Sequence, residues 1–137
     1  MSLRFESLMN ENDALQMNAL QLAYLGDSVW ETIVRYELAS RKYNVRHMHR
    51  ECVSLVNAHS QAQLLLVIQD SLDNIEADVV RRGRNAHPKH AAPKNQDPEE
   101  YAASTGFEAL FGFLYLTGKD DRIRTLVNHI REVKYHG

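Results

Sequence analysis

The sequence predicts an all-α fold, and three observations support this class. No proline precedes Pro88, and the only glycines before it are Gly26 and Gly83, so the two strongest helix breakers are nearly absent from that part of the chain. Apolar residues recur at spacings of three and four, as they do on one face of a helix. Alternation of β-branched and polar residues over the length of a strand is missing.

The apolar spacing and its breaks divide the chain into six expected helices. They cover residues 17–40, 46–58, 60–70, 72–86, 98–117 and 119–134. The first has an apolar stripe at helical spacing, formed by Leu22, Leu25, Val29, Ile33 and Tyr36. The second and third also carry apolar faces and are separated by a break near residues 57–60. Their apolar residues are Val53 and Val56, then Leu64, Leu65 and Ile68.

A polar, proline-marked segment separates the fourth helix from the fifth. Ser71 and Asp97 are the expected N-caps of these two helices, because their side chains can accept hydrogen bonds from free N–H groups at a helix start. The fourth helix should end at Arg84 or Asn85, and residues 87–96 should form a loop. The fifth helix is apolar nearly all round, so we expect it to be buried.

Length and composition indicate one domain over residues 1–137. Of the 137 residues, 44% are hydrophobic, which is enough to form a core. The single cysteine, Cys52, excludes an internal disulfide and a zinc–thiolate site, and we expect it to be buried and inert. No apolar run approaches the roughly 20 residues of a membrane span, and residues 1–10 lack the layout of a signal peptide. We therefore expect a cytoplasmic protein.

Two acids, Asp27 and Glu108, lie inside apolar runs, where a buried charge is costly. They form either buried ion pairs or helix-end contacts, or else a functional site, and the residues leave both open. Gly26 precedes Asp27 and Gly112 follows Glu108 by one turn, as expected where helices cross closely or a ligand approaches. Both interpretations bring the two helices into contact. Two carboxylates between crossing helices would form an oxygen-only site suited to Mg²⁺ or Mn²⁺.

Three motifs resemble those of a known family. Residues 22–30, LAYLGDSVW, resemble the signature helix of the ribonuclease III family, and residues 105–116, TGFEALFGFLYL, resemble its second catalytic helix. Residues 82–86, RGRNA, resemble the branch called Mini-ribonuclease III, which has the catalytic domain alone. The resemblance spans about residues 17–134 and implies a single ribonuclease III-like catalytic domain without a double-stranded-RNA-binding domain.

The resemblance implies the ribonuclease III endonuclease-domain fold, a homodimer, and a Mg²⁺-dependent endoribonuclease that cleaves double-stranded RNA. The products would carry 5′-phosphate and 3′-hydroxyl ends, and the substrate would be the precursor of large-subunit (23S) ribosomal RNA. Asp27 and Glu108 match the family's two central metal-binding acids and are the expected catalytic residues. Ala23 and Thr105 stand where the family has further acids. They motivate an alternative function, a non-catalytic RNA-binding or ribosome-associated module with the same fold. A third alternative is an all-α protein-interaction domain.

Two other residues have roles that the sequence leaves open. Glu31 is four residues after Asp27, so it has either an outer-shell role at the metal or an ion pair with Arg35, one turn further on. Tyr24 falls where the family places an aromatic residue at its dimer contact, and core packing explains it almost as well.

The expected RNA contacts come from residues 79–96, a window that contains no acid although the net charge of the chain is −2. Duplex RNA is recognised through its phosphates and 2′-hydroxyls, which Arg, Lys and Asn side chains can contact. The alternative is a solvated helix end whose cations offset the helix dipole. The candidate contacts are Arg81, Arg82, Arg84, Asn85, Lys89 and Lys94.

Overall fold

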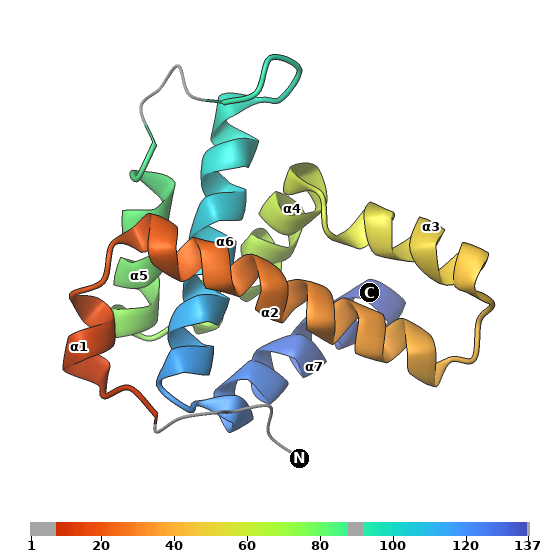
Figure 1. Ribbon diagram of the computed structural model, residues 1–137, viewed down its shortest axis with the longest axis horizontal. Helices are drawn as coiled ribbons and strands as arrows, with labels where there is room; N and C mark the ends of the chain where they lie inside the picture. The colour runs from red at the N-terminus through yellow and green to blue at the C-terminus, as the bar shows by residue number, and fades with distance from the viewer. Residues whose placement is uncertain (1–7, 88–91, 137) are drawn as a thin grey trace.

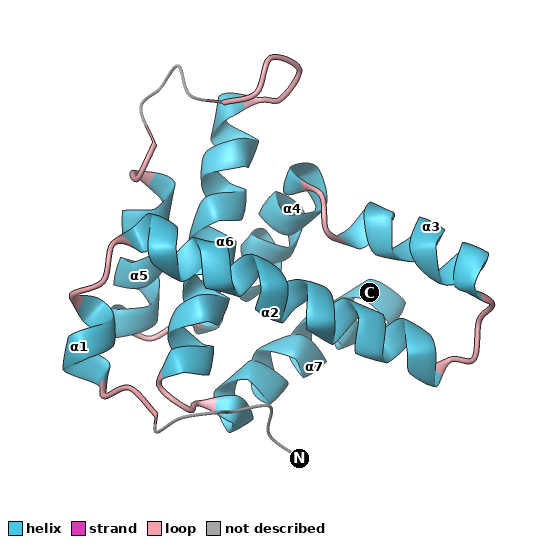
Figure 2. Cartoon of the chain, in the orientation of Figure 1, coloured by secondary structure: helices cyan, strands magenta, loops and turns pink. Residues whose placement is uncertain are grey.

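The computed structural model describes residues 8–87 and 92–136, with the side chains of residues 134–136 left out. Over these ranges the chain forms seven α-helices, one short 3₁₀ turn (η1) and no strand, so the all-α prediction is confirmed (Figure 2). The elements are α1 (Glu11–Leu15), α2 (Ala19–Ser40), α3 (Val45–Leu55), α4 (Ala58–Ile68), η1 (Gln69–Ser71), α5 (Asn74–Arg84), α6 (Pro98–Leu116) and α7 (Asp120–His136).

Side-chain caps explain where several helices begin. The Asp97 side chain accepts a hydrogen bond from the Glu99 N–H at 3.1 Å, which confirms it as the cap of α6. The prediction that Ser71 caps the fourth helix is wrong, because α5 begins at Asn74 and is capped by Asp73 in a reciprocal box with Glu76. Ser71 lies in η1 instead, where its hydroxyl donates to the Ile68 carbonyl.

The first helix, α1, was not expected from the sequence. Its five residues are too few to show an apolar repeat, but Asn10 caps it by accepting a hydrogen bond from the Asp13 N–H at 2.8 Å. Ala14, the one buried residue of α1, joins the core.

The core of the fold is built around α6, which α2, α4, α5 and α7 surround (Figure 1). Three of its phenylalanines, Phe107, Phe111 and Phe113, are fully buried, as expected for a helix that is apolar nearly all round. Trp30 of α2 packs edge-on against Phe107, with ring centroids 5.0 Å apart. Its indole N–H donates to the Leu55 carbonyl at 3.1 Å, and this hydrogen bond fixes the last residue of α3 to the core.

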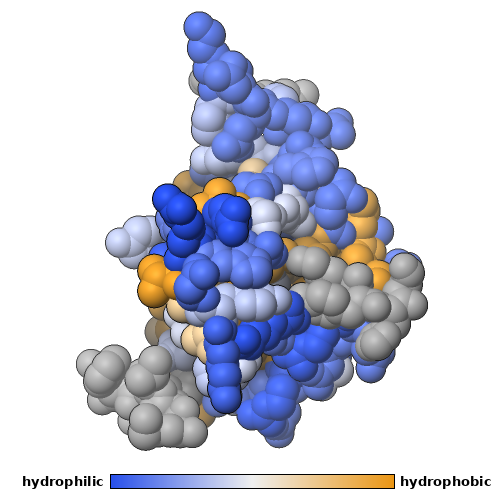
Figure 3. Space-filling model, turned by 90° about the vertical axis from the view of Figure 1, so that its right-hand side faces the viewer, coloured by the Kyte–Doolittle hydropathy of each residue, from blue (hydrophilic) through white to orange (hydrophobic). Residues whose placement is uncertain are grey.

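Outside this core, α3 runs back alongside the second half of α2 (Figure 1). Cys52 is the buried residue of α3 and its thiol is free, as expected. The face in Figure 3 is mainly hydrophilic, with small hydrophobic patches. None of the helices in the described ranges has the length and hydropathy of a membrane span.

The contact between α2 and α6 depends on two glycines that leave no room for a side chain. A Cβ atom at Gly26 would lie 1.6 Å from the Glu108 carbonyl oxygen, and one at Gly112 would lie 2.0 Å from the Leu22 carbonyl oxygen. The two helices therefore touch backbone to backbone, and the predicted contact between them is confirmed. This crossing brings the turn that carries Asp27 directly over the turn that carries Glu108.

We expect Gly26→Ala to destabilise the protein by about 3 kcal/mol or more, because its methyl group can fit only if the two helices separate. Urea denaturation followed by circular dichroism measures the loss. Ser28→Ala, on an exposed position of the same helix, is the matched control and should stay within about 0.5 kcal/mol of wild type. Equal stability of the two variants would contradict the backbone contact.

Candidate active site

The carboxyl groups of Asp27 and Glu108 meet where α2 crosses α6. The two side chains lie in contact, although 81 positions separate them in the chain. Asp27 is exposed at the surface, whereas Glu108 is half-buried beneath it. The structure therefore places the two acids together, with one side of the pair open to a ligand.

The environment of Glu108 favours its neutral form. The pKa of Glu108 is raised from 4.5 to about 8, chiefly by burial and also by the adjacent Asp27 side chain and its negative charge. The neighbouring Gln61 amide opposes this shift. A divalent cation would replace the proton, since positive charge between the two carboxylates removes their repulsion.

Gln61 of α4 is a site residue that the sequence did not suggest. Its side chain is only 2% exposed and lies beside the Glu108 carboxyl group, from a third helix. Its Nε2 atom is buried with no hydrogen-bond partner in the part of the chain that the structure describes. An unpaired buried amide costs about 1–3 kcal/mol. Helical spacing is the sequence signal that could have identified Gln61 as buried. It shares a helix face with Leu65 and Ile68, which are both buried.

Two contacts fix the start of α4 and so the position of Gln61. Asn57 caps the helix by accepting a hydrogen bond from the Ser60 N–H at 2.8 Å. His59 Nδ1 lies 2.5 Å from Glu100 Oε2, which joins the first turn of α4 to the first turn of α6. Neither contact was expected from the sequence.

The positions that depart from the family pattern are filled by small buried side chains. Ala23 is 6% exposed and belongs to the core. Thr105 is 4% exposed, and its hydroxyl donates to the Tyr101 carbonyl at 3.1 Å. Across residues 8–87 and 92–136, no group of three or more His, Cys, Asp or Glu side chains could hold a metal ion. The acid pair still fits Mg²⁺, which commonly takes one or two protein carboxylates and keeps several waters.

The structure bears on the alternatives given for Glu31 and for Tyr24. The Glu31 carboxylate lies 3.4 Å from the Arg35 guanidinium on the surface of α2, as the ion-pair alternative predicts. Tyr24 is 85% exposed, so core packing does not explain it. Its side chain is available for a contact with another molecule.

The candidate RNA contacts on α5 point in two directions. Arg82 turns inward and donates to the Leu15 carbonyl at 2.9 Å and to the Met17 carbonyl at 2.6 Å, so its guanidinium is occupied within the fold. Arg81 is exposed and pairs with Asp78 at 2.5 Å. Arg84, Asn85 and Lys94 are exposed. Lys89 lies outside the described residues.

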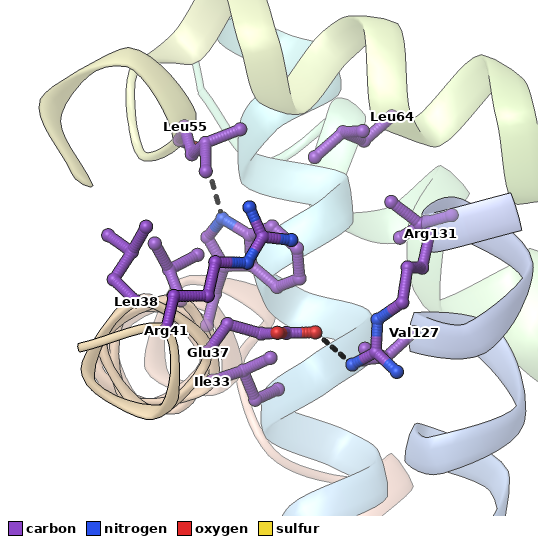
Figure 4. Close-up of a pocket in the computed structure, with 11 residues that line it drawn as sticks. Ile33, Glu37, Leu38, Arg41, Leu55, Leu64, Val127 and Arg131 are labelled. Atoms are coloured by element: carbon purple, nitrogen blue, oxygen red, sulfur yellow. Dashed lines mark hydrogen bonds and ion pairs between the residues drawn. The ribbon is translucent and has the colours of Figure 1, made fainter. Parts of the chain in front are cut away.

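A separate apolar pocket lies between α2, α4, α7 and the end of α3, away from the two acids (Figure 4). It has a volume of about 60 Å³, with Trp30 and Leu38 among the residues that line it. An ion pair between Glu37 and Arg131 crosses its edge (Figure 4). Its lining lacks Asp27, Glu108 and Gln61, so this pocket is not part of the acid site.

This chain is similar to known proteins of the ribonuclease III family. Residues 20–119 match the ribonuclease III domain. A Mini-ribonuclease 3 of Symbiobacterium thermophilum is 51% identical over 80% of this chain and 84% of its own length. A Mini-ribonuclease 3 of Desulfitobacterium hafniense is 48% identical over 79% of this chain and 68% of its own length.

A solved structure supports the same fold. The crystal structure of a protein from Fusobacterium nucleatum is similar to this chain with a TM-score of 0.79. The two chains are 27% identical, and the similarity covers 89% of this chain and 98% of the other.

We expect the metal-free protein to lose stability as pH rises from about 4.5 to about 8. In this range the folded chain keeps a proton on Glu108 that the unfolded chain has released, because the pKa of Glu108 is raised from 4.5 to about 8 by folding. The associated stability is fully present below about pH 4.5 and is lost as pH rises through about 8. The slope relative to Glu108→Gln should reach up to about 1.4 kcal/mol per pH unit.

Urea denaturation in EDTA at several pH values measures this difference. The Glu108→Gln variant is the reference, because it keeps the shape of the side chain but does not titrate. Parallel stability profiles for the two proteins would contradict the raised pKa of Glu108.

Proposed function

The chain belongs to the ribonuclease III family of endoribonucleases, and from this membership we propose that it is a Mini-ribonuclease 3-type enzyme that cleaves double-stranded RNA at a divalent-metal site formed by Asp27 and Glu108. The observation that carries the proposal is the adjacent acid pair at the glycine crossing of α2 and α6. Its two acids come from the two helices that carry the family motifs. Because Asp27 is exposed and Glu108 is half-buried, one side of the pair is open to a hydrated cation and a substrate.

Asp27 and Glu108 would hold the cation, with Mg²⁺ as the preferred ion and Mn²⁺ as a substitute. Oxygen donors alone suit both ions. When bound, the cation would supply Lewis-acid activation of water and would neutralise charge on the scissile phosphate. The exposed Asp27 carboxylate would face the RNA backbone, whereas the more buried Glu108 would hold its oxygens in a fixed direction. The products would carry 5′-phosphate and 3′-hydroxyl ends.

The RNA would lie along the exposed residues at the end of α5 and in the segment after it. Arg81 and Arg84 would contact phosphates, Asn85 would contact a 2′-hydroxyl, and Lys94 would extend the basic track. We leave Arg82 out of this set because two backbone carbonyls of the fold already occupy it. Lys89 also belongs to the proposed RNA contacts, on the basis of the sequence alone.

The proposed assembly and substrate rest on the family resemblance of the sequence motifs. A homodimer would present two acid pairs to the two strands of a duplex, and the exposed Tyr24 would lie in its interface. The proposed substrate, the precursor of 23S ribosomal RNA, follows from the resemblance of residues 82–86 to the Mini-ribonuclease III branch. We treat residues 1–137 as one catalytic domain, because α2 and α6 share a single core with the helices between them.

We expect Asp27→Asn and Glu108→Gln each to lower cleavage of a long RNA duplex in Mg²⁺ by about 100- to 1000-fold, because each removes a charged ligand of the proposed cation. Single-turnover gel assays of the purified protein measure the rate. Asp70→Asn and Glu132→Gln make the same changes at exposed positions and should leave the rate unchanged. Undiminished cleavage by Asp27→Asn would refute the proposed site. Binding without cleavage by wild type would favour the non-catalytic RNA-binding module.

We expect Arg84→Ala to weaken binding of duplex RNA and to reduce the slope of log K against log salt by about 1, because one phosphate contact is lost. Fluorescence anisotropy at several salt concentrations in EDTA measures binding without cleavage. Arg124→Ala removes an exposed arginine of α7 and is the control. An unchanged salt slope in Arg84→Ala would show that this end of α5 does not contact the RNA.

A further inference from the structure

We propose that Gln61 is a positioning residue of the active site: its side-chain amide donates a hydrogen bond to the Glu108 carboxylate when Glu108 ligates the cation, and so directs the remaining oxygen of Glu108 at the ion. This inference rests on the proposed function of Asp27 and Glu108. It adds a residue from a third helix, outside residues 22–30, 82–86 and 105–116, whose motifs were quoted for the family resemblance.

The burial of Gln61 is the first argument. The side chain is 2% exposed, and its Nε2 atom has no hydrogen-bond partner within the described ranges of the chain. Buried amide groups in folded proteins almost always have a partner, so an unpaired one calls for an explanation. On the same face of α4, Leu65 and Ile68 are buried apolar residues. An apolar residue at position 61 would therefore continue that face without an unpaired group.

The position of Gln61 is the second argument. Its amide lies beside the Glu108 carboxyl group, and Asp27 contacts the same group. An ionised carboxylate has two oxygens and about four sites that accept hydrogen bonds or ions, so it can bind a cation and an amide at the same time. Carboxylates that bind metals are usually held by such hydrogen bonds, which set their orientation. Gln61 is the buried donor in place to do this for Glu108.

The rigidity of the start of α4 is the third argument. The Asn57 cap and the contact between His59 and Glu100 hold this turn against α6. The amide of Gln61 is therefore carried on a fixed backbone rather than on a loop. A donor that orients a ligand needs this rigidity, because a mobile donor would accept several orientations of the carboxylate.

The test measures Mn²⁺ binding to the full-length chain by electron paramagnetic resonance, together with thermal unfolding in EDTA. We expect Gln61→Leu to lower Mn²⁺ affinity about 10-fold or more. The same variant should unfold in EDTA at the wild-type Tm or a few degrees above it, because the unpaired amide is gone. Gln63→Leu makes the same change at an exposed position of α4 and should leave both quantities unchanged.

Cleavage assays add a readout that distinguishes positioning from folding. In Gln61→Leu the Mn²⁺ concentration for half-maximal cleavage should rise by the same factor as the dissociation constant, and most of the rate should return at saturating Mn²⁺. Wild-type Mn²⁺ affinity in Gln61→Leu would overturn the proposal. If this variant does not fold, Gln61→Met, which is unbranched and similar in volume, takes its place in every measurement.

Asp27→Asn separates the failure of this inference from the failure of the proposed function. Loss of Mn²⁺ binding in Asp27→Asn with wild-type binding in Gln61→Leu would overturn the role of Gln61 alone. Wild-type Mn²⁺ binding in Asp27→Asn would overturn the metal site itself and the role of Gln61 with it. Weakened binding in both variants, with Gln63→Leu unchanged, is the expected result.

Discussion

The backbone contact between α2 and α6 is the constraint on which the rest of the structure depends. Because Gly26 and Gly112 carry no side chain, the two helices approach until main-chain atoms touch. The same approach buries Phe107 against Trp30 and stacks the turn of Asp27 over that of Glu108. Core packing and the meeting of the acids thus have one cause. The burial of the Glu108 carboxyl group is a cost that the packing of the core offsets.

The fold could be predicted because its signals are local. Proline and glycine positions, apolar spacing and the Asp97 cap all act within one helix or at one of its ends. The acid pair could also be predicted, because each acid has a glycine within one turn and both helices carry family motifs. The short helix α1 and the Asp73 cap were missed. Each depends on a hydrogen bond to one capping side chain, Asn10 or Asp73, and the apolar pattern beside that residue is weak.

The roles of Gln61 and Arg82 could not be predicted, because they depend on how distant helices pack. Nothing near Gln61 in the sequence indicates that α4 meets α6 beside Glu108. Likewise, three arginines in four positions suggest one basic surface, yet successive helical residues are rotated by about 100°. Arg81 and Arg84 therefore point outward while Arg82 points into the fold. Local charge does not show which side of a helix the core will occupy.

The inward arginine has a consequence for the mechanics of the molecule. Arg82 links the last helical turn before the proline-marked segment to the carbonyls of Leu15 and Met17, where the chain passes from α1 to α2. A force applied to the end of α5 is thus transmitted to the start of the helix that carries Asp27. A displacement of this end of α5 would therefore reach α2 through the two hydrogen bonds and residues 16–18, which join α1 to α2.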